Sequence, residues 1–194
     1  MPRPATQFSL VVVCAALLGL AATCSAAPAS SPRTLYSLGD SLAVGTDAYL
    51  GDLLPDWTIA SSAVVGRRSD EGLQALKKRR GKLPRVLLVS LGTNDDPNNV
   101  DAFTAVVREV ERIAGKNRCV VWATIVRPPV DGVAYDAFNN VLRSEDSRLK
   151  NFRLVDWATI VERTPSYLRD DGVHAASSGY RARATEAARV IRLC

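Results

Sequence analysis

The 194-residue chain is poor in the residues that usually bind metals, since it has a single histidine, His174, and only four cysteines. So few nitrogen and sulfur ligands argue against a zinc centre, and we expect neither a metal nor a cofactor. The glycine-rich motifs that bind nucleotide phosphates, Gly-x-x-x-x-Gly-Lys-Ser/Thr and Gly-x-Gly-x-x-Gly, are both absent. The net charge of +5 comes without a recognition motif, so we expect no nucleic-acid partner.

The sequence also lacks an apolar run long enough to cross a membrane comfortably. The apolar stretch 8–22 follows a basic start and precedes small residues, which is the layout of a secretory signal. We therefore expect a signal peptide over 1–26, a linker over 27–33 and one domain over 34–194, in a secreted or periplasmic protein with no membrane span in its mature form. The alternatives are a lipid anchor on Cys24 and an uncleaved N-terminal anchor.

Two of the four cysteines, Cys14 and Cys24, lie in the expected leader. The remaining pair, Cys119 and Cys194, is even in number, and in an exported protein this suggests a disulfide. The alternative is two unpaired thiols, because sequence alone does not fix pairing.

Strand and helix patterns alternate along the rest of the chain. Apolar runs bounded by turn residues predict strands over 34–38, 57–60, 86–91, 119–125 and 152–155. Residues with helical periodicity predict helices over 42–54, from 69 onward, over 103–114 and 135–149, and from 177 to the C-terminus. This alternation predicts one α/β domain, which we expect to be a monomer, with a parallel sheet covered by helices on both faces.

The predicted helix that begins near residue 69 has recognisable ends. Ser69 is typical of an N-cap, and the acidic residues 70 and 71 suit the positive end of the helix dipole. The basic cluster 77–82 is interpreted as a solvated last turn, with Gly81 ending the helix. Arg67 and Arg68, just before the helix, are expected to be solvated.

Polar residues follow several predicted strands, at the edge where parallel sheets bind ligands. Ser41 comes directly after the first strand, and His174 precedes the last helix. A serine hydroxyl is a weak nucleophile that needs an adjacent base, and His174 is the only imidazole available. Asp171 lies three residues earlier, close enough to orient the imidazole through a short turn. These residue types predict a Ser41–His174–Asp171 triad.

An oxyanion needs N–H donors close to the nucleophile. The backbone N–H of Ser41 at a helix start, the backbone N–H of Gly66 and the side-chain amide of Asn94 are the candidates. Each has a structural alternative: Ser41 could cap its helix, and Gly66 and Asn94 could serve turns. Asp40 is interpreted as a structural hydrogen-bonding residue.

This set of motifs resembles the SGNH hydrolase family, also called GDSL esterases and lipases. The matching blocks occur in family order, as Gly39-Asp40-Ser41-Leu42, Gly66, Gly92-x-Asn94-Asp95 and Asp171-x-x-His174. The resemblance implies a three-layer α/β/α sandwich with a flavodoxin-like five-stranded parallel sheet in the order 2-1-3-4-5, and the site roles given above. One departure is Ser61, which stands where the family often has asparagine.

The sequence therefore predicts a secreted serine esterase that hydrolyses small acyl esters, such as those of acetylated glycans, through an acyl-enzyme on Ser41. A second hypothesis is an O-acyltransferase acting on glycans, because the segments 139–140, 155–157 and 171–174 look similar to SGNH domains of polysaccharide O-acyltransferases. A third is a binding module that has the SGNH fold but no catalysis, and the complete triad argues against it.

Overall fold

The computed structural model describes Met1 and residues 32–194. The expected signal peptide over 1–26, with Cys14 and Cys24, and most of the expected linker lie outside the described residues. The strands are β1 (Arg33–Gly39), β2 (Trp57–Ala63), β3 (Val86–Ser90), β4 (Cys119–Ala123) and β5 (Phe152–Val155). The α-helices are α1 (Ser41–Leu53), α2 (Ser69–Arg79), α3 (Val100–Ala114), α4 (Asp136–Arg148), α5 (Trp157–Arg163) and α6 (Ser177–Ile191).

The five strands form one parallel sheet in the order β2-β1-β3-β4-β5. The predicted fold class, a three-layer α/β/α sandwich with the flavodoxin-like order 2-1-3-4-5, is therefore confirmed. β1 lies between β2 and β3, with Gly39 opposite both Ala63 and Ser90. The chain leaves the carboxyl ends of β1, β2 and β3 on the same side, so the loops that carry the candidate site residues lie together.

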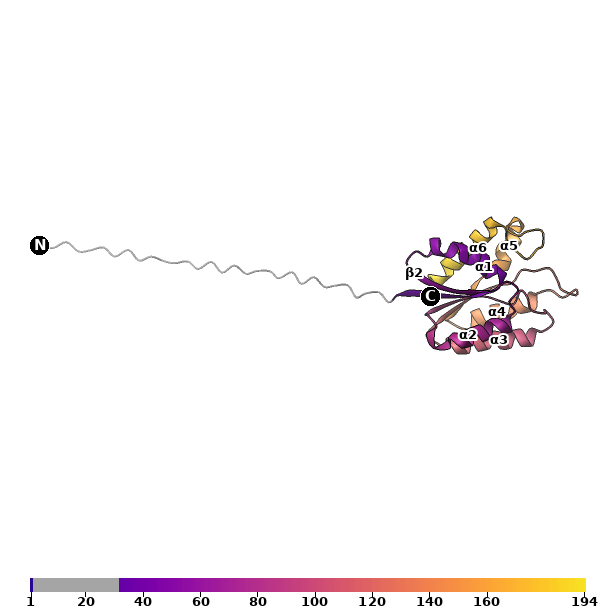
Figure 1. Cartoon of the computed structure of the whole chain (residues 1–194), viewed down its shortest axis with the longest axis horizontal. Coiled ribbons are helices and arrows are strands. Elements are labelled where there is room, and N and C mark those ends of the chain that lie inside the picture. The colour runs from indigo at the N-terminus through magenta and orange to yellow at the C-terminus, as the bar shows by residue number, and fades with distance from the viewer. Residues whose placement is uncertain (2–31) are drawn as a thin grey trace. The chain divides into compact units, whose positions relative to one another are not determined.

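Helices cover both faces of the sheet, as Figure 1 shows: α2, α3 and α4 lie on one face, and α1, α5 and α6 on the other. The first face buries a cluster rich in aromatic rings, including Phe103, Trp122, Phe138 and Phe152. The second face buries aliphatic side chains together with the small residues Ala184, Ala187 and Ala188 of α6. Apolar residues at helical spacing produce both layers, because each helix buries one stripe against the sheet.

The structure corrects several details of the sequence prediction. β2 continues to Ala63, past the predicted end at residue 60, because it pairs with the full length of β1. Arg68, not Ser69, is the N-cap of α2, and the Ser69 hydroxyl donates to Asp95 instead. The basic residues 77–79 do form the exposed last turn, but α2 ends at Arg79 and continues as a 3₁₀ turn over Arg80–Lys82 that contains Gly81.

The sequence prediction missed the helix α5 and the 3₁₀ turn Pro165–Tyr167 that follows it. α5 has only seven residues, too few for a helical pattern to be recognised. It is held by Trp157, which is fully buried, and by Val161. This short unit connects β5 to the loop that carries Asp171 and His174.

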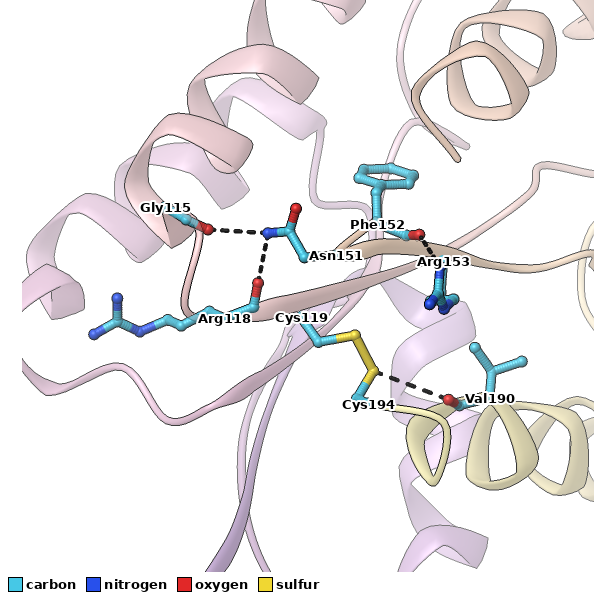
Figure 2. Close-up of a disulfide and its surroundings, with 8 residues drawn as sticks. All are labelled: Gly115, Arg118, Cys119, Asn151, Phe152, Arg153, Val190 and Cys194. Atoms are coloured by element: carbon cyan, nitrogen blue, oxygen red, sulfur yellow. Dashed lines mark hydrogen bonds between the residues drawn. A yellow bond between two sulfur atoms is a disulfide. The ribbon is translucent and has the colours of Figure 1, made fainter. Parts of the chain in front are cut away.

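A disulfide joins Cys119, at the start of β4, to Cys194, three residues beyond the end of α6. The predicted pairing is therefore present, across a sequence separation of 75 residues. Figure 2 shows that the bond lies beside Asn151, whose amide donates to the carbonyls of Gly115 (3.0 Å) and Arg118 (2.8 Å). The disulfide thus attaches α6 to the sheet at the amino end of β4, opposite the edge that carries the candidate site.

Across residues 32–194, no helix combines the length and the apolar character that a membrane span requires.

Candidate active site

The candidate nucleophile lies in the turn between β1 and α1. Gly39 ends the strand where a side chain would collide with Ala43 and with the backbone of Ser90, so glycine allows the close approach of β1 to β3. Asp40 is the N-cap of α1, and its carboxylate accepts the N–H of Leu42 at 2.9 Å. The cap is therefore Asp40, not Ser41, and the structural role predicted for Asp40 is present. Ser41 is the first residue of the helix and is partly exposed.

The structure brings Ser41, His174 and Asp171 into one hydrogen-bonded line. The Ser41 Oγ lies 2.9 Å from His174 Nε2, and His174 Nδ1 lies 2.8 Å from Asp171 Oδ2. An imidazole that donates from Nδ1 to a carboxylate has Nε2 free to accept the serine proton. This is the arrangement that general-base activation of a serine requires.

The loop between the 3₁₀ turn Pro165–Tyr167 and α6 is built to hold Asp171 and His174 in place. The backbone N–H groups of Val173 and His174 both donate to Asp171 Oδ1, at 2.9 and 2.8 Å. These bonds, with that from the His174 side chain, lower the pKa of Asp171 to about 2. Gly172 has a φ of 66°, which favours glycine in the tight turn between the two residues. The loop is closed by the N–H of Arg169, which donates to the carbonyl of His174 at 2.8 Å.

The two other candidate oxyanion residues lie in neighbouring loops that contact one another. Asn94 Nδ2 donates to the carbonyl of Arg67 at 3.1 Å, which places the Asn94 loop beside the Gly66 loop. A side-chain amide has two N–H donors, so this bond orients Asn94 and leaves one donor for a ligand. Gly66 has a φ of 76°, which favours glycine, and a side chain built there would point into open space.

The Gly66 loop is also fixed to the nucleophile strand. The N–H of Val64 donates to the carbonyl of Gly39 at 3.0 Å, and the guanidinium of Arg67 reaches the same carbonyl at 3.4 Å. Arg67 also donates to the carbonyl and hydroxyl of Ser62. The prediction that Arg67 is merely solvated is therefore wrong, because its side chain is partly buried and binds backbone carbonyls. Arg68 is exposed, as expected, and pairs with Asp70.

Ser61 stands where the resembling family often has asparagine, and the structure gives it a partner. Its hydroxyl donates to Asp47 Oδ2 at 2.5 Å, and Ser37 donates to the other oxygen of the same carboxylate at 2.7 Å. Asp47 therefore links α1 to both β1 and β2. This contact supports the helix that begins at Ser41.

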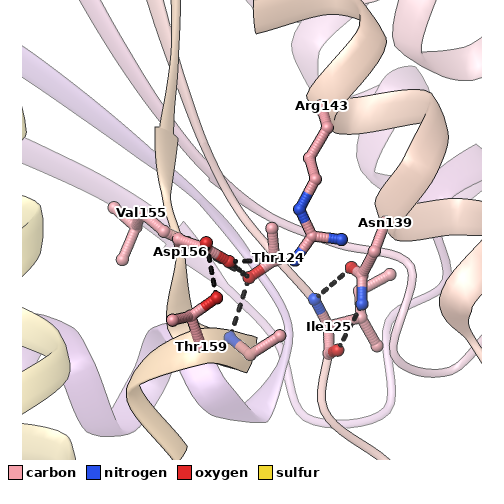
Figure 3. A network of polar contacts seen from close by, with 8 residues as sticks. Thr124, Ile125, Asn139, Arg143, Val155, Asp156 and Thr159 are labelled. Atoms are coloured by element: carbon pink, nitrogen blue, oxygen red, sulfur yellow. Dashed lines mark hydrogen bonds and ion pairs between the residues drawn. The ribbon is translucent and has the colours of Figure 1, made fainter. Parts of the chain in front are cut away.

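The loops after β4 and β5 are held by two polar residues that the sequence analysis singled out. Figure 3 shows Asn139 of α4 bound to the backbone of Ile125, with bonds of 2.7 and 2.8 Å in opposite directions. In the same view Asp156 accepts from Thr124 (3.2 Å) and Thr159 (2.7 Å). Asn139 therefore hydrogen-bonds to the backbone after β4, and Asp156 to the hydroxyls of neighbouring threonines after β4 and β5.

One buried charge close to the nucleophile turn was missed by the sequence analysis. Arg183 of α6 is 3% exposed and contacts Thr46 and Ser90. A signal was present: Arg183 lies on the same helical stripe as Tyr180, Ala184 and Ala187, and such spacing predicts a stripe that faces inward. A charged residue on an apolar stripe indicates a buried partner.

Over residues 32–194, no group of three or more His, Cys, Asp or Glu side chains is arranged to hold a metal ion.

Comparison with known proteins identifies the family. Residues 37–182 match the GDSL-like Lipase/Acylhydrolase family, so the chain belongs to that family of ester-hydrolysing serine hydrolases. No curated protein matches the chain by sequence. The resemblance to SGNH hydrolases inferred from the motifs is confirmed.

Solved structures with the same fold include three from bacteria. A member of the lipolytic protein G-D-S-L family from Veillonella parvula has a TM-score of 0.69 at 14% identity, covering 84% of this chain and 100% of that one. The C-terminal catalytic domain of peptidoglycan O-acetyltransferase A from Streptococcus pneumoniae has a TM-score of 0.66 at 19% identity, covering 84% and 92%. The psychrotrophic esterase EstA from Pseudoalteromonas sp. has a TM-score of 0.60 at 18% identity, covering 83% and 97%. At these identities the likeness is one of fold.

Proposed function

We propose that this protein hydrolyses small acyl esters through an acyl-enzyme on Ser41. The observation that carries the proposal is the continuous hydrogen-bonded line from Ser41 Oγ to His174 Nε2 (2.9 Å) and from His174 Nδ1 to Asp171 Oδ2 (2.8 Å). Membership of a family of ester-hydrolysing serine hydrolases supports it.

In the first half of the reaction, Ser41 Oγ attacks the carbonyl carbon of the ester while His174 Nε2 takes its proton. The carbonyl oxygen becomes an oxyanion in a tetrahedral intermediate. His174 then gives the proton to the leaving alkoxide, the carbon–oxygen bond breaks, and an alcohol departs. The acyl group remains as an ester of Ser41. Asp171 stabilises the imidazolium without itself taking the proton.

In the second half, water attacks the acyl-enzyme and His174 Nε2 takes a proton from it. The second tetrahedral intermediate collapses when His174 returns this proton to Ser41 Oγ. The carboxylic acid is released and the free enzyme is restored. The same three side chains therefore serve both halves, with the imidazole exchanging the roles of base and acid.

The oxyanion of both intermediates would be bound by N–H groups from three loops. We assign these donors to the backbone of Ser41 and Gly66 and to the free amide N–H of Asn94. The bond from Asn94 to the carbonyl of Arg67 supports this assignment, because it orients the amide before substrate arrives. Loss of one such donor typically lowers kcat by about 10²–10³.

A short acyl chain is supported by the openness of the site. The side chains of His174 and Asp171 are 38% and 48% exposed. Sites for long apolar ligands usually enclose most of the ligand surface. An acetyl or similarly small group needs no such enclosure, and the alcohol part would extend toward solvent.

The test combines an active-site probe with an ester panel. A fluorophosphonate should label purified protein at Ser41, and Ser41→Ala should abolish both labelling and turnover while keeping the wild-type melting temperature. Among esters of increasing chain length and acetylated carbohydrates, kcat/KM should be highest for the shortest acyl groups. Folded wild-type protein that fails to react with the probe would contradict catalysis and support the alternative, a binding module.

A second candidate, transfer of an acyl group to a glycan hydroxyl in place of water, is supported by the fold shared with the peptidoglycan O-acetyltransferase domain. The segments 139–140 and 155–157 do not favour it further, because Asn139 and Asp156 bind neighbouring protein groups. With an activated acetyl donor and a glycan acceptor, release of free acetate supports hydrolysis, and acetylated glycan supports transfer.

We also propose that the protein works outside the cytoplasm. The disulfide between Cys119 and Cys194 supports this, because such bonds persist in oxidising compartments. Fractionation of expressing cells should find the enzyme beyond the inner membrane, processed near residue 26. Retention of the full-length chain in the cytoplasm would contradict the proposal.

A further inference from the structure

The buried arginine of α6 lies at the centre of a polar cluster behind the nucleophile turn. Arg183 donates from Nη1 to Thr46 Oγ1 at 2.7 Å and from Nη2 to Ser90 Oγ at 2.9 Å. Its guanidinium lies 5.9 Å from the centroid of the Trp157 ring. Burying a charge is strongly unfavourable unless it is paired and hydrogen-bonded. A residue this costly to bury therefore calls for an explanation beyond the packing of α6.

Among the carboxylates that attract Arg183, Asp40 in the turn that precedes Ser41 acts more strongly than Asp47 of α1. Asp40 is completely buried, and its carboxylate accepts the N–H of Leu42 at 2.9 Å and the Ser90 hydroxyl at 3.4 Å. Burial raises the pKa of Asp40, and the positive charge of Arg183 acts against that rise. The Ser90 hydroxyl thus donates to the Asp40 carboxylate and accepts from the Arg183 guanidinium.

Ser90 connects this pair to the position of the nucleophile. Its carbonyl accepts the N–H of Asp40 at 3.1 Å, so Ser90 contacts Asp40 through both its backbone and its side chain. The residue after Asp40 is Ser41. Arg183, for its part, lies on the helix that follows His174. The cluster therefore connects the element that carries the base to the turn that carries the nucleophile.

We propose that Arg183 is a positioning residue for the reaction: through Ser90 it fixes the Asp40–Ser41 turn against the helix that follows His174, and its charge balances the buried carboxylate of Asp40 next to Ser41. This inference rests on the proposed function, in which Ser41 is the nucleophile. A purely structural arginine would affect the stability of the fold but not the rate per folded enzyme.

A matched pair of hydroxyl deletions separates the two roles. Ser90→Ala and Thr46→Ala each remove one buried hydroxyl that accepts from Arg183, but only Ser90 also contacts Asp40. We expect Ser90→Ala to lower kcat by about tenfold to a hundredfold, the cost of a small misplacement of a reacting group, with little change in KM. Thr46→Ala should lower the melting temperature while kcat stays close to that of the wild type.

Charge balance is tested by rescue. Arg183→Met leaves the Asp40 carboxylate uncompensated, and we expect it to lower kcat more than Ser90→Ala does. Adding Asp40→Asn to Arg183→Met removes that charge and should recover part of the lost kcat, although each single change is harmful. A purely structural role predicts that the two losses simply add. If Arg183→Met does not fold, Arg183→Lys is measured in its place, together with Ser90→Ala and Thr46→Ala. Lysine keeps the charge but cannot make both hydrogen bonds.

Fluorophosphonate labelling separates failure of this inference from failure of the proposed function. Wild-type protein that folds but is not labelled at Ser41 would overturn the function on which the inference rests. Wild-type protein that is labelled, together with Ser90→Ala and Thr46→Ala proteins labelled as fast as the wild type, would overturn the inference alone. Slow labelling confined to Ser90→Ala and to the Arg183 variants is the expected result.

Discussion

The face of the sheet beneath α2, α3 and α4 is rich in aromatic rings, whereas the face beneath α1 and α6 combines aliphatic and small side chains with a buried arginine. On the first face, Phe103 stacks on Phe138 with ring centroids 4.2 Å apart. On the second, Asp40 in the turn before Ser41 and Arg183 of α6 are buried. Apolar packing stabilises a fold without fixing the direction of any one group, while buried hydrogen bonds fix geometry at a cost in stability. We therefore expect changes on the two faces to affect different measurements.

The largest effect is expected in the loop that precedes α6. In the proposed mechanism the Asp171 carboxylate holds the His174 ring in its tautomer and stabilises the imidazolium, so Asp171→Asn should lower kcat by on the order of 10³–10⁴. The fold should change little, because the Asp171 side chain is 48% exposed. Steady-state kinetics and thermal melting on the same preparation would check both statements. A variant with wild-type kcat would remove Asp171 from the triad.

The pH dependence of the wild-type enzyme sharpens this expectation. Hydrogen bonds from the Val173 backbone and from His174 lower the pKa of Asp171 to about 2, so its carboxylate stays ionised at any pH above about 3. The lowered pKa contributes stability that is present above the ordinary value of 3.8 and is lost as the pH falls through 2. The acid limb of the rate profile should therefore not follow the ionisation of Asp171. An acid limb centred below pH 4 would contradict this assignment.

On the aromatic face the expected effect is on stability. Phe152 is 1% exposed, and its ring lies 6.3 Å from that of Trp122, at the amino end of β5. Phe152→Ala should lower the free energy of unfolding by about 3–5 kcal/mol through lost burial and cavity formation. Because the site lies at the opposite edge of the sheet, kcat per folded molecule should not change. Denaturant unfolding measures the free energy of unfolding, and steady-state kinetics below the unfolding transition measure kcat. If Phe152→Ala does not fold, Phe152→Leu is used in its place.

The disulfide tests what decides whether a change affects kcat: the face of the sheet on which it lies, or its distance from the carboxyl ends of the strands. Cys194 follows α6, on the same side as the buried charges, but its bond to Cys119 lies at the amino end of β4. Replacing both cysteines by serine should lower the free energy of unfolding by about 2–4 kcal/mol, because the unfolded chain loses a constraint. The kcat should not change. Reductant should destabilise the wild type alone, and a change in kcat would mean that α6 transmits strain from this end to His174.

The sequence was informative where local pattern and function coincide. The parallel sheet follows from the alternating elements and its strand order from the family resemblance, and the residues of the candidate triad follow from their chemistry at strand ends. The cap of α2 could not be predicted, because the Ser69 hydroxyl is used by Asp95, twenty-six residues away. Arg67 was misjudged for a similar reason. Its guanidinium contacts the carbonyl of Gly39 at the end of β1, twenty-eight residues away. Partners distant in sequence leave no local pattern.

Buried charges were the hardest features to predict. Arg183 lies on an apolar stripe whose alanines are buried, yet the position of its partners Thr46 and Ser90 depends on how α1, β3 and α6 pack. Sequence periodicity shows which way a residue faces but not which polar groups it meets there. The same limit applies to Glu111 and Glu145, acidic residues on α3 and α4 that meet Arg148 at the rim of the aromatic face.

Glu111 provides the smallest expected effect, a dependence of stability on pH at the aromatic face. Its side chain is 11% exposed and pairs with Arg148 at 2.9 Å. Burial, together with the nearby charge of Glu145, raises its pKa from 4.5 to about 7. A carboxyl whose pKa is higher in the folded state contributes stability that is full below pH 4.5 and is lost as the pH rises through 7. The wild type should therefore lose stability between these values.

Glu111→Gln removes this titration while nearly preserving the shape of the side chain. We expect the variant to exceed the wild type by on the order of 2 kcal/mol at pH 8 and to lose most of that advantage at pH 5. Glu109→Gln is the matched control on the same helix: Glu109 is bound by Arg112, which lowers its pKa, so its replacement should give no gain at pH 8. Urea unfolding at both pH values decides the matter. Equal gains from the two variants would show that the overall acidity of α3, not the burial of Glu111 against the aromatic layer, sets the pH response of this face.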